Sequence, residues 1–221
     1  MQVRLPRPDE HVAIAGRTGS GKTQAAIDML SRRDLSKQAW LVIDHKRDEK
    51  VGMLPATPLS IAPRFLPDRG LYRVRPDLLD PNHAADLEDL MLRCLRKGKI
   101  GLHIDEGHCM PVNSPALKAI LTMGREKKCV VNWCAQRATN ISPYVWSQAS
   151  IYRCFALQTP NDIKRFNENF PVRYSGERLK KYWSYWYDIP EGQMYVVPPA
   201  RDIQESLDAL SRQVSVSFRK V

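Results

Sequence analysis

Several features are missing from this 221-residue sequence, and each absence narrows the class of protein. No apolar run approaches the roughly eighteen residues of a membrane-spanning helix, so we expect no insertion into a membrane. The N-terminus carries no signal-peptide pattern, so we expect the protein to stay in the cytoplasm where it is made. There is no internal repeat and no low-complexity segment. These absences leave a globular chain long enough to bury a core of its own.

Cysteine is scarce and unpatterned. The five cysteines are odd in number and include no C-x-x-C pair, which argues for reduced thiols rather than a disulfide framework. His103, His108 and Cys109 come nearest to a zinc-ligand cluster, but their spacing matches no standard zinc pattern. We therefore expect no zinc site from them.

Acidic residues are in the minority. The chain has 34 Lys and Arg against 24 Asp and Glu, a formal net charge of +10. A basic surface attracts polyanions and suits nucleic acid, although a solvated basic surface without a specific ligand is the alternative. The basic clusters are Arg93-Arg96-Lys97-Lys99, Arg125-Lys127-Lys128 and Arg178-Lys180-Lys181.

A glycine-rich octapeptide matches the phosphate-binding P-loop pattern G-x-x-x-x-G-K-[ST] at every fixed position. Apolar residues 11–15 before it predict a short buried strand, and residues 24–30 after it predict a helix. Strand, glycine loop and helix are the context that the motif requires; a glycine-rich turn without a ligand is the alternative. The motif residues are Gly16, Arg17, Thr18, Gly19, Ser20, Gly21, Lys22 and Thr23.

The residue types in this motif predict its chemistry. Glycines adopt backbone angles that a Cβ would penalise, so successive N–H groups can surround phosphate oxygens. The following helix adds the positive end of its dipole. Lys22 can then reach the β- and γ-phosphates, and the Thr23 hydroxyl can ligate magnesium. The sequence therefore predicts binding of ATP with Mg²⁺.

The rest of the chain alternates strand and helix patterns. Strands are predicted over residues 39–44, 71–74, 99–105, 128–134 and 151–157, and helices over residues 83–97, 114–124 and 143–148. This alternation predicts an α/β fold with a mainly parallel sheet flanked by helices. Prolines interrupt residues 52–70, which predicts a loop. We expect an ATPase core over residues 1–170 and a small hairpin and helical extension over residues 171–221, packed on that core.

An aromatic run marks the extension. Residues 182–187, followed by residues 194–197 across a short turn, predict a hairpin. In an extended strand Trp183, Tyr185 and Tyr187 face one side, and Tyr182 and Trp186 face the other. Burial in a sheet or in a subunit interface is favoured over stacking on bases of single-stranded DNA.

Two carboxylates end the strand predicted over residues 99–105. Asp105 and Glu106 would reach the same sheet edge as the P-loop, where Asp105 can hold Mg²⁺ and Glu106 can act as the base that polarises the attacking water. Capping of the next helix is the alternative role for the pair.

Polar side chains also follow the next strand. Gln136 is predicted to sense the γ-phosphate. Two arginines are candidates for the residue that stabilises transition-state charge at a neighbouring subunit's nucleotide. They are Arg125, which precedes that strand, and Arg137, which follows it. A surface ion pair of little energetic weight is the alternative for each arginine.

These residues resemble the HerA/FtsK superfamily of DNA-pumping ATPases. The resemblance lies in Gly-Arg-Glu-Lys-Lys at residues 124–128, Ala-Gln-Arg-Ala-Thr-Asn-Ile-Ser-Pro at residues 135–143, Ser-Gln-Ala-Ser at residues 147–150 and Pro-Asn-Asp-Ile-Lys at residues 160–164. It covers about residues 10–166, and the compact size is most similar to the genome-packaging ATPases of viruses and phages.

The resemblance implies a RecA-like core and a ring-shaped motor. By resemblance, the Walker lysine and hydroxyl fall on Lys22 and Thr23, and the acidic pair falls on Asp105 and Glu106. The family's glutamine falls on Gln136, and its arginine finger falls on Arg125. It also implies double-stranded DNA as the partner, a pentameric or hexameric ring, docking at a capsid vertex or portal, and residence in the host cytoplasm or on the virion. The alternatives are a morphogenesis ATPase of the zonula-occludens-toxin type, and a non-motor P-loop nucleotide-binding protein or kinase.

Overall fold

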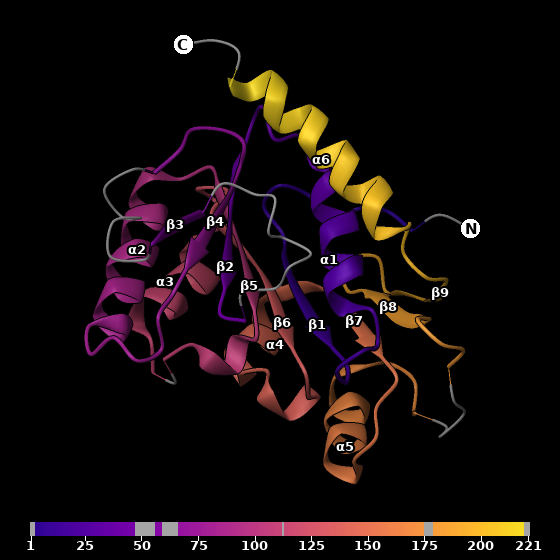
Figure 1. The fold of residues 1–221 in the computed structure, drawn as a ribbon. Helices are drawn as coiled ribbons and strands as arrows, with labels where there is room; N and C mark the ends of the chain where they lie inside the picture. Colours follow the sequence, from indigo (N-terminus) through magenta and orange to yellow (C-terminus); the bar gives the residue numbers. More distant parts are fainter. Residues whose placement is uncertain (1–2, 47–55, 59–65, 112, 175–178, 219–221) are drawn as a thin grey trace.

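One sheet runs through the whole molecule. The computed structural model describes residues 3–46, 56–58, 66–111, 113–174 and 179–218. Across these residues nine strands pair in the order β3-β4-β2-β5-β6-β1-β7-β8-β9 (Figure 1). The strands are β1 (His11–Ala15), β2 (Ala39–Asp44), β3 (Ala56–Pro58), β4 (Leu71–Arg75), β5 (Ile100–Asp105), β6 (Val130–Ala135), β7 (Ala149–Phe155), β8 (Ser184–Asp188) and β9 (Gln193–Val197).

The sheet is parallel from β3 to β7, and β8 and β9 continue it in antiparallel pairing. Every residue of the five inner strands β2, β5, β6, β1 and β7 is buried, as expected for parallel strands covered on both faces. The helices are α1 (Lys22–Ser31), α2 (His83–Lys97), α3 (Pro115–Met123), α4 (Pro143–Gln148), α5 (Pro160–Asn169) and α6 (Ile203–Phe218), with short 3₁₀ turns η3 (Gly107–Cys109) and η4 (Ala138–Asn140).

Helices cover the two faces of the sheet unequally. On one face α1 and α6 pack together, with Ile27 and Leu210 in one cluster with Trp40 of β2. On the other face α2, α3, α4 and α5 share a larger core with the alternate residues of the same strands, such as Leu41 and Leu102. Figure 1 shows these helical layers on either side of the sheet. The parallel α/β fold is therefore confirmed.

One prediction about local structure needs correction, and one helix was not predicted. Residues 52–70 are not loop throughout, because β3 pairs with β4 as an edge strand, a position that tolerates its Pro58. The helix α5 is an addition to the predicted elements. Its N-terminal signals are ordinary: the Thr159 side chain accepts a hydrogen bond from the Asp162 N–H, and Pro160 stands at the first turn.

The aromatic run forms the predicted hairpin, but this hairpin extends the main sheet. Trp186 packs with the core beside α1, while Tyr185 and Tyr187 pack on the opposite face against residues such as Phe166. Trp186 is thus buried, as predicted, whereas Tyr185 and Tyr187 are only partly buried, as is Trp183, which precedes the strand. Tyr182 lies outside the strand and is exposed.

The N-terminal arm is joined to β8 by charged groups, which gives a prediction about stability. Arg4 pairs with buried Glu10 (2.7 Å) and also donates to Asp188. Burial alone would raise the pKa of Glu10, but hydrogen bonds from Arg4 and the Arg7 N–H outweigh it and lower that pKa. A carboxylate whose pKa is lower in the folded state stabilises the fold above its unfolded pKa of about 4.3, and this contribution is lost as the pH falls through the folded value.

We expect Glu10→Gln to lower the free energy of unfolding by about 1.5–3 kcal/mol at pH 7, the range for hydrogen bonds to charged groups. Urea denaturation at pH 7 and at about pH 3 would measure it, and the difference from wild type should shrink at the lower pH. The matched control is Glu191→Gln, because Glu191 also lies near Arg4 (3.5 Å) but its side chain is 49% exposed. A difference that persists undiminished at acid pH would contradict the ion-pair explanation.

Candidate nucleotide-binding site

The P-loop connects β1 to α1 at the carboxyl edge of the sheet. Gly19 (φ +75°) and Gly21 (φ +98°) both lie in the region of backbone space that penalises a Cβ. The Ser20 hydroxyl is buried and has no hydrogen-bond partner among the described residues. A buried polar atom in a loop of positive-φ residues can hydrogen-bond to a phosphate oxygen, as in a phosphate-binding loop.

Lys22 and Thr23 open α1. The Lys22 Nζ donates to the carbonyl oxygens of Gly16 (2.6 Å) and Arg17 (3.1 Å), so the ammonium group is held across the loop itself. Burial lowers the pKa of Lys22. A buried cation bonded only to carbonyls is well matched to an incoming anion.

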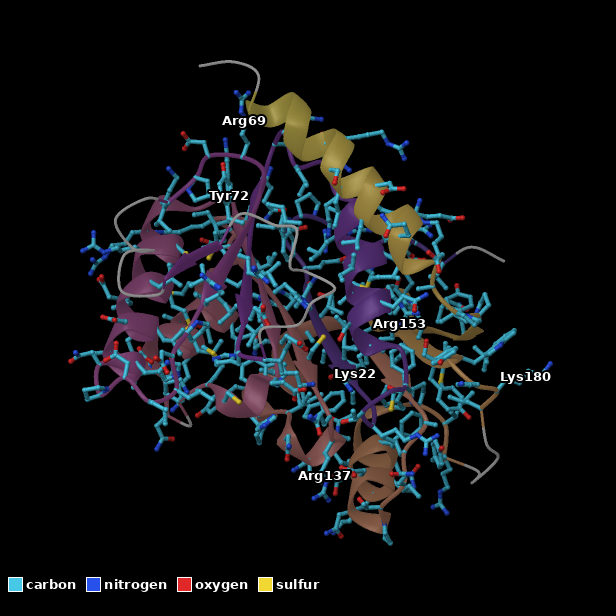
Figure 2. The ribbon with its side chains drawn as sticks, viewed as in Figure 1. Lys22, Arg69, Tyr72, Arg137, Arg153 and Lys180 are labelled. Carbon is cyan, nitrogen blue, oxygen red and sulfur yellow. The ribbon has the colours of Figure 1, made fainter. Side chains whose placement is uncertain are left out.

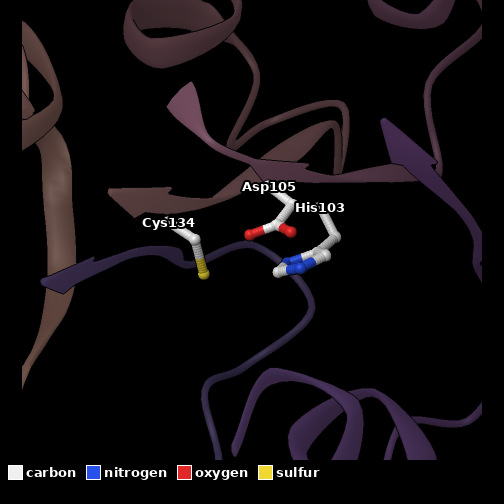
Figure 3. Close-up of side chains that lie close together, drawn as sticks. All are labelled: His103, Asp105 and Cys134. Carbon is white, nitrogen blue, oxygen red and sulfur yellow. The ribbon is translucent and has the colours of Figure 1, made fainter. Parts of the chain in front are cut away.

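Asp105 ends β5 and is buried at the same edge. Its backbone is paired with Asp44, the last residue of β2. Figure 3 shows the Asp105 carboxylate beside His103 and Cys134, with one ligand atom of each within 4.8 Å of the others. Burial lowers the pKa of His103 and raises that of the Cys134 thiol, and Mg²⁺ prefers oxygen ligands to nitrogen or sulfur. Asp105 is therefore the member of this trio suited to a hard cation such as Mg²⁺.

Glu106 stands next, in a left-handed backbone conformation (φ 56°) that turns the chain out of the strand. Its Oε1 accepts a hydrogen bond from Gln136 Nε2 (3.0 Å) and pairs with the Lys46 ammonium group. Its Oε2 lies 3.3 Å from His108 Nδ1. Because Glu106 is only 2% exposed, these groups define its surroundings. Lys46 and His108 were not among the predicted site residues.

The two candidate arginines lie at opposite edges of the sheet. Arg137 follows β6 and donates to Asp162 Oδ2 (3.2 Å) on α5. It lines a cavity of about 410 Å³ together with Arg17 and Thr18 of the P-loop. In Figure 2, Arg137 and Lys22 lie toward the end of the sheet opposite to Arg69. Arg137 therefore lies at the same edge of the sheet as the P-loop of its own chain.

Arg125 precedes β6 and so lies at the amino edge, away from its own P-loop. Its guanidinium group donates to the Gln148 carbonyl (2.7 Å) and the Ser150 hydroxyl (2.9 Å). The residue is exposed. This position lies at the edge of the sheet opposite to its own P-loop.

Two of the basic clusters meet at this amino edge. Lys99 donates its N–H to the Lys127 carbonyl (2.7 Å), which joins the start of β5 to the turn before β6. A cavity of about 660 Å³ there is lined by five basic residues and two aspartates. The basic residues are Arg33, Lys37, Lys97, Lys99 and Lys128. Of the third cluster, Arg178 lies outside the described residues.

The residues at the carboxyl edge fit a magnesium nucleotide. The loop glycines and the partnerless Ser20 hydroxyl suit phosphate oxygens, and Lys22 suits their charge. Thr23 and Asp105 supply the hydroxyl and carboxylate oxygens that Mg²⁺ prefers.

A phage protein is similar to almost the whole chain. It is the DNA packaging ATPase P9 of Enterobacteria phage PRD1, which is 28% identical over 211 residues, covering 90% of this chain and 91% of P9. The chain is homologous to a phage packaging ATPase. No protein-family model matches it.

Solved structures agree on the fold. The genome packaging NTPase B204 of Sulfolobus turreted icosahedral virus 2, in complex with AMP, matches with a TM-score of 0.70 and 22% identity over 88% of this chain and 99% of B204. VirB4 of Thermoanaerobacter pseudethanolicus matches with a TM-score of 0.62 and 10% identity over 89% of this chain and 91% of VirB4. At these identities the likeness is one of fold. The predicted resemblance to packaging ATPases is thus confirmed, and with it the P-loop fold class.

Proposed function

We propose that this protein is a genome-packaging ATPase that couples ATP hydrolysis at the P-loop to the movement of double-stranded DNA. The observation that carries the proposal is the Gln136–Glu106 hydrogen bond at the edge where the P-loop also lies. It joins a candidate phosphate sensor to the candidate catalytic base. The homology to P9 and the net charge of +10 support DNA as the polymer that is moved.

Each residue has a distinct role in this proposal. The P-loop N–H groups and Lys22 bind the phosphates, and Thr23 and Asp105 hold Mg²⁺, which would offset phosphate charge. Glu106 accepts a proton from the attacking water. Its pairing with Lys46 must loosen first, because a carboxylate already bonded to an ammonium group is a poor proton acceptor. Gln136 bonds both to Glu106 and, in this proposal, to the γ-phosphate, so hydrolysis changes its partners.

The motor acts as a ring of five or six copies in this proposal. Arg125 supports the ring because it lies at the edge away from its own P-loop and is exposed. A capsid vertex or portal as the docking partner rests on the resemblance to packaging ATPases. No helix among the described residues is long and apolar enough to cross a bilayer.

Displacement of a triplex-forming oligonucleotide from a long DNA duplex tests translocation directly. With ATP and Mg²⁺ the wild-type protein should release the third strand, and Lys22→Ala, which retains the basic surface, should not. Wild-type release with ATPγS alone, or no release with ATP despite hydrolysis, would contradict the motor function. The second of these results would favour the extrusion or kinase alternatives.

A further inference from the structure

An exposed aromatic ring borders the P-loop, and the roles assigned above leave it unused. Among the described residues, Tyr144 (50% exposed) and Tyr182 (42% exposed) are the aromatic side chains that are exposed. The Tyr182 Cδ1 lies 3.3 Å from the point that a Cβ on Gly21 would occupy. Gly21 is the N-cap of α1, directly before Lys22. The ring therefore contacts the phosphate loop directly before Lys22.

The order of the strands brings this ring to the loop. Since β7 is the neighbour of β1, and β8 that of β7, the residues that lead into β8 arrive beside the residues that follow β1. Phe155, at the end of β7, lies 3.7 Å from the Cβ position of Gly21, but it is 1% exposed. Phe155 thus belongs to the core under the loop, whereas Tyr182 stands at its open side. Figure 2 shows Lys180, from the same segment, on the side of Lys22 away from β5.

The backbone holds Tyr182 in an unfavourable conformation. Its φ of +67° is in the left-handed region, which bulky residues rarely adopt. A hydrogen bond from the Trp183 N–H to the Lys180 carbonyl (2.9 Å) closes the turn, and the Lys181 Nζ lies 4.9 Å from the Tyr182 ring centroid. Strained residues of this kind persist where their surroundings hold them, and they concentrate at ligand sites.

We propose that Tyr182 is the base subsite of this nucleotide site: the purine of ATP stacks on its ring while the P-loop holds the phosphates. The inference rests on the proposed nucleotide-binding function. Every base has a π face, so stacking on an aromatic ring tolerates changes of base. The subsite therefore distinguishes a nucleotide from a bare polyphosphate more than it distinguishes adenine from guanine.

Isothermal titration calorimetry of the full chain with ATPγS and with inorganic tripolyphosphate, both with Mg²⁺, tests the subsite. Tyr182→Ala should weaken ATPγS binding by about 5- to 150-fold, the range for losing one aromatic–base stack. It should leave tripolyphosphate binding unchanged. Tyr182→Phe should bind ATPγS like wild type, because the ring is kept.

Two further variants separate recognition from folding. Tyr182→Gly removes the ring where glycine is the favoured residue for the backbone, so it should keep the wild-type melting temperature and still lose ATPγS affinity. Tyr144→Ala is the matched control, because Tyr144 is also exposed and has a lysine 4.9 Å from its ring centroid; it should bind like wild type.

The outcomes distinguish this inference from the function on which it rests. Wild-type protein that binds neither ligand would refute nucleotide binding altogether. Wild-type protein that binds tripolyphosphate as tightly as ATPγS, or a Tyr182→Ala variant that weakens both ligands equally or neither, would overturn the base subsite and leave the P-loop assignment intact.

Discussion

Replacing Glu106 with glutamine is expected to slow ATP hydrolysis by about 10²- to 10⁴-fold, the usual contribution of a general base. Glutamine keeps the shape and the hydrogen bond with Gln136 but cannot accept a proton from water. ATP binding should stay intact, because the proposed phosphate contacts are made by the P-loop and Gln136 rather than by Glu106. Steady-state phosphate release, with ATPγS titrated in parallel, measures both effects.

Glu88→Gln is the matched control for this change. Like Glu106, Glu88 accepts a hydrogen bond, in this case from the Ala116 N–H (2.9 Å). It lies on α2, away from the P-loop. The Glu88→Gln variant should hydrolyse ATP like wild type. Hydrolysis by Glu106→Gln near the wild-type rate would remove Glu106 as the base. Loss of ATP binding together with hydrolysis would show that Glu106 shapes the site instead.

Arg125→Ala is expected to lower hydrolysis in the assembled ring by about 10³- to 10⁵-fold, the contribution of an arginine finger. Mixing the Arg125→Ala variant with Lys22→Ala subunits should restore part of the lost hydrolysis. Lys22→Ala subunits cannot hold the phosphates but still carry Arg125, whereas Arg125→Ala subunits have an intact P-loop. In a randomly mixed equimolar ring, about one quarter of the sites then combine an intact P-loop with an intact neighbouring arginine. Hydrolysis should rise to about that fraction of the wild-type rate.

The companion mixture uses Arg137→Ala in place of Arg125→Ala. Arg137 lies at the P-loop edge of its own chain, so no site in a mixture with Lys22→Ala combines both groups. We therefore expect no recovery. Recovery with Arg137→Ala and none with Arg125→Ala would exchange their roles, and recovery with neither would exclude an arginine supplied by a neighbour from either position.

Much of this site could be predicted because its motifs are local in sequence. The P-loop is a continuous octapeptide, and Asp105 and Glu106 follow an apolar strand directly. Since the carboxyl ends of parallel strands meet at one edge, their proximity follows from the fold class. Gln136 could be predicted for the same reason, because it directly follows the next strand in the chain.

The partners of Glu106 could not be predicted in the same way. Lys46 reaches Glu106 because β2 is the direct neighbour of β5, and strand order is a property of the whole sheet rather than of any segment. Tyr182 lies 160 positions from Lys22 in the numbering of the chain and meets the P-loop only through the order β1-β7-β8. Its exposure could not be predicted either, because the later aromatics of the same run are buried or partly buried.

In the proposed motor, ATP hydrolysis is coupled to DNA within a ring. Steady-state ATP hydrolysis with and without long double-stranded DNA, at low salt and at several protein concentrations, tests it most directly. We predict stimulation by DNA and a rate that rises more steeply than the protein concentration, because each complete site needs two subunits. A rate that ignores DNA and stays strictly proportional to protein concentration would contradict the account.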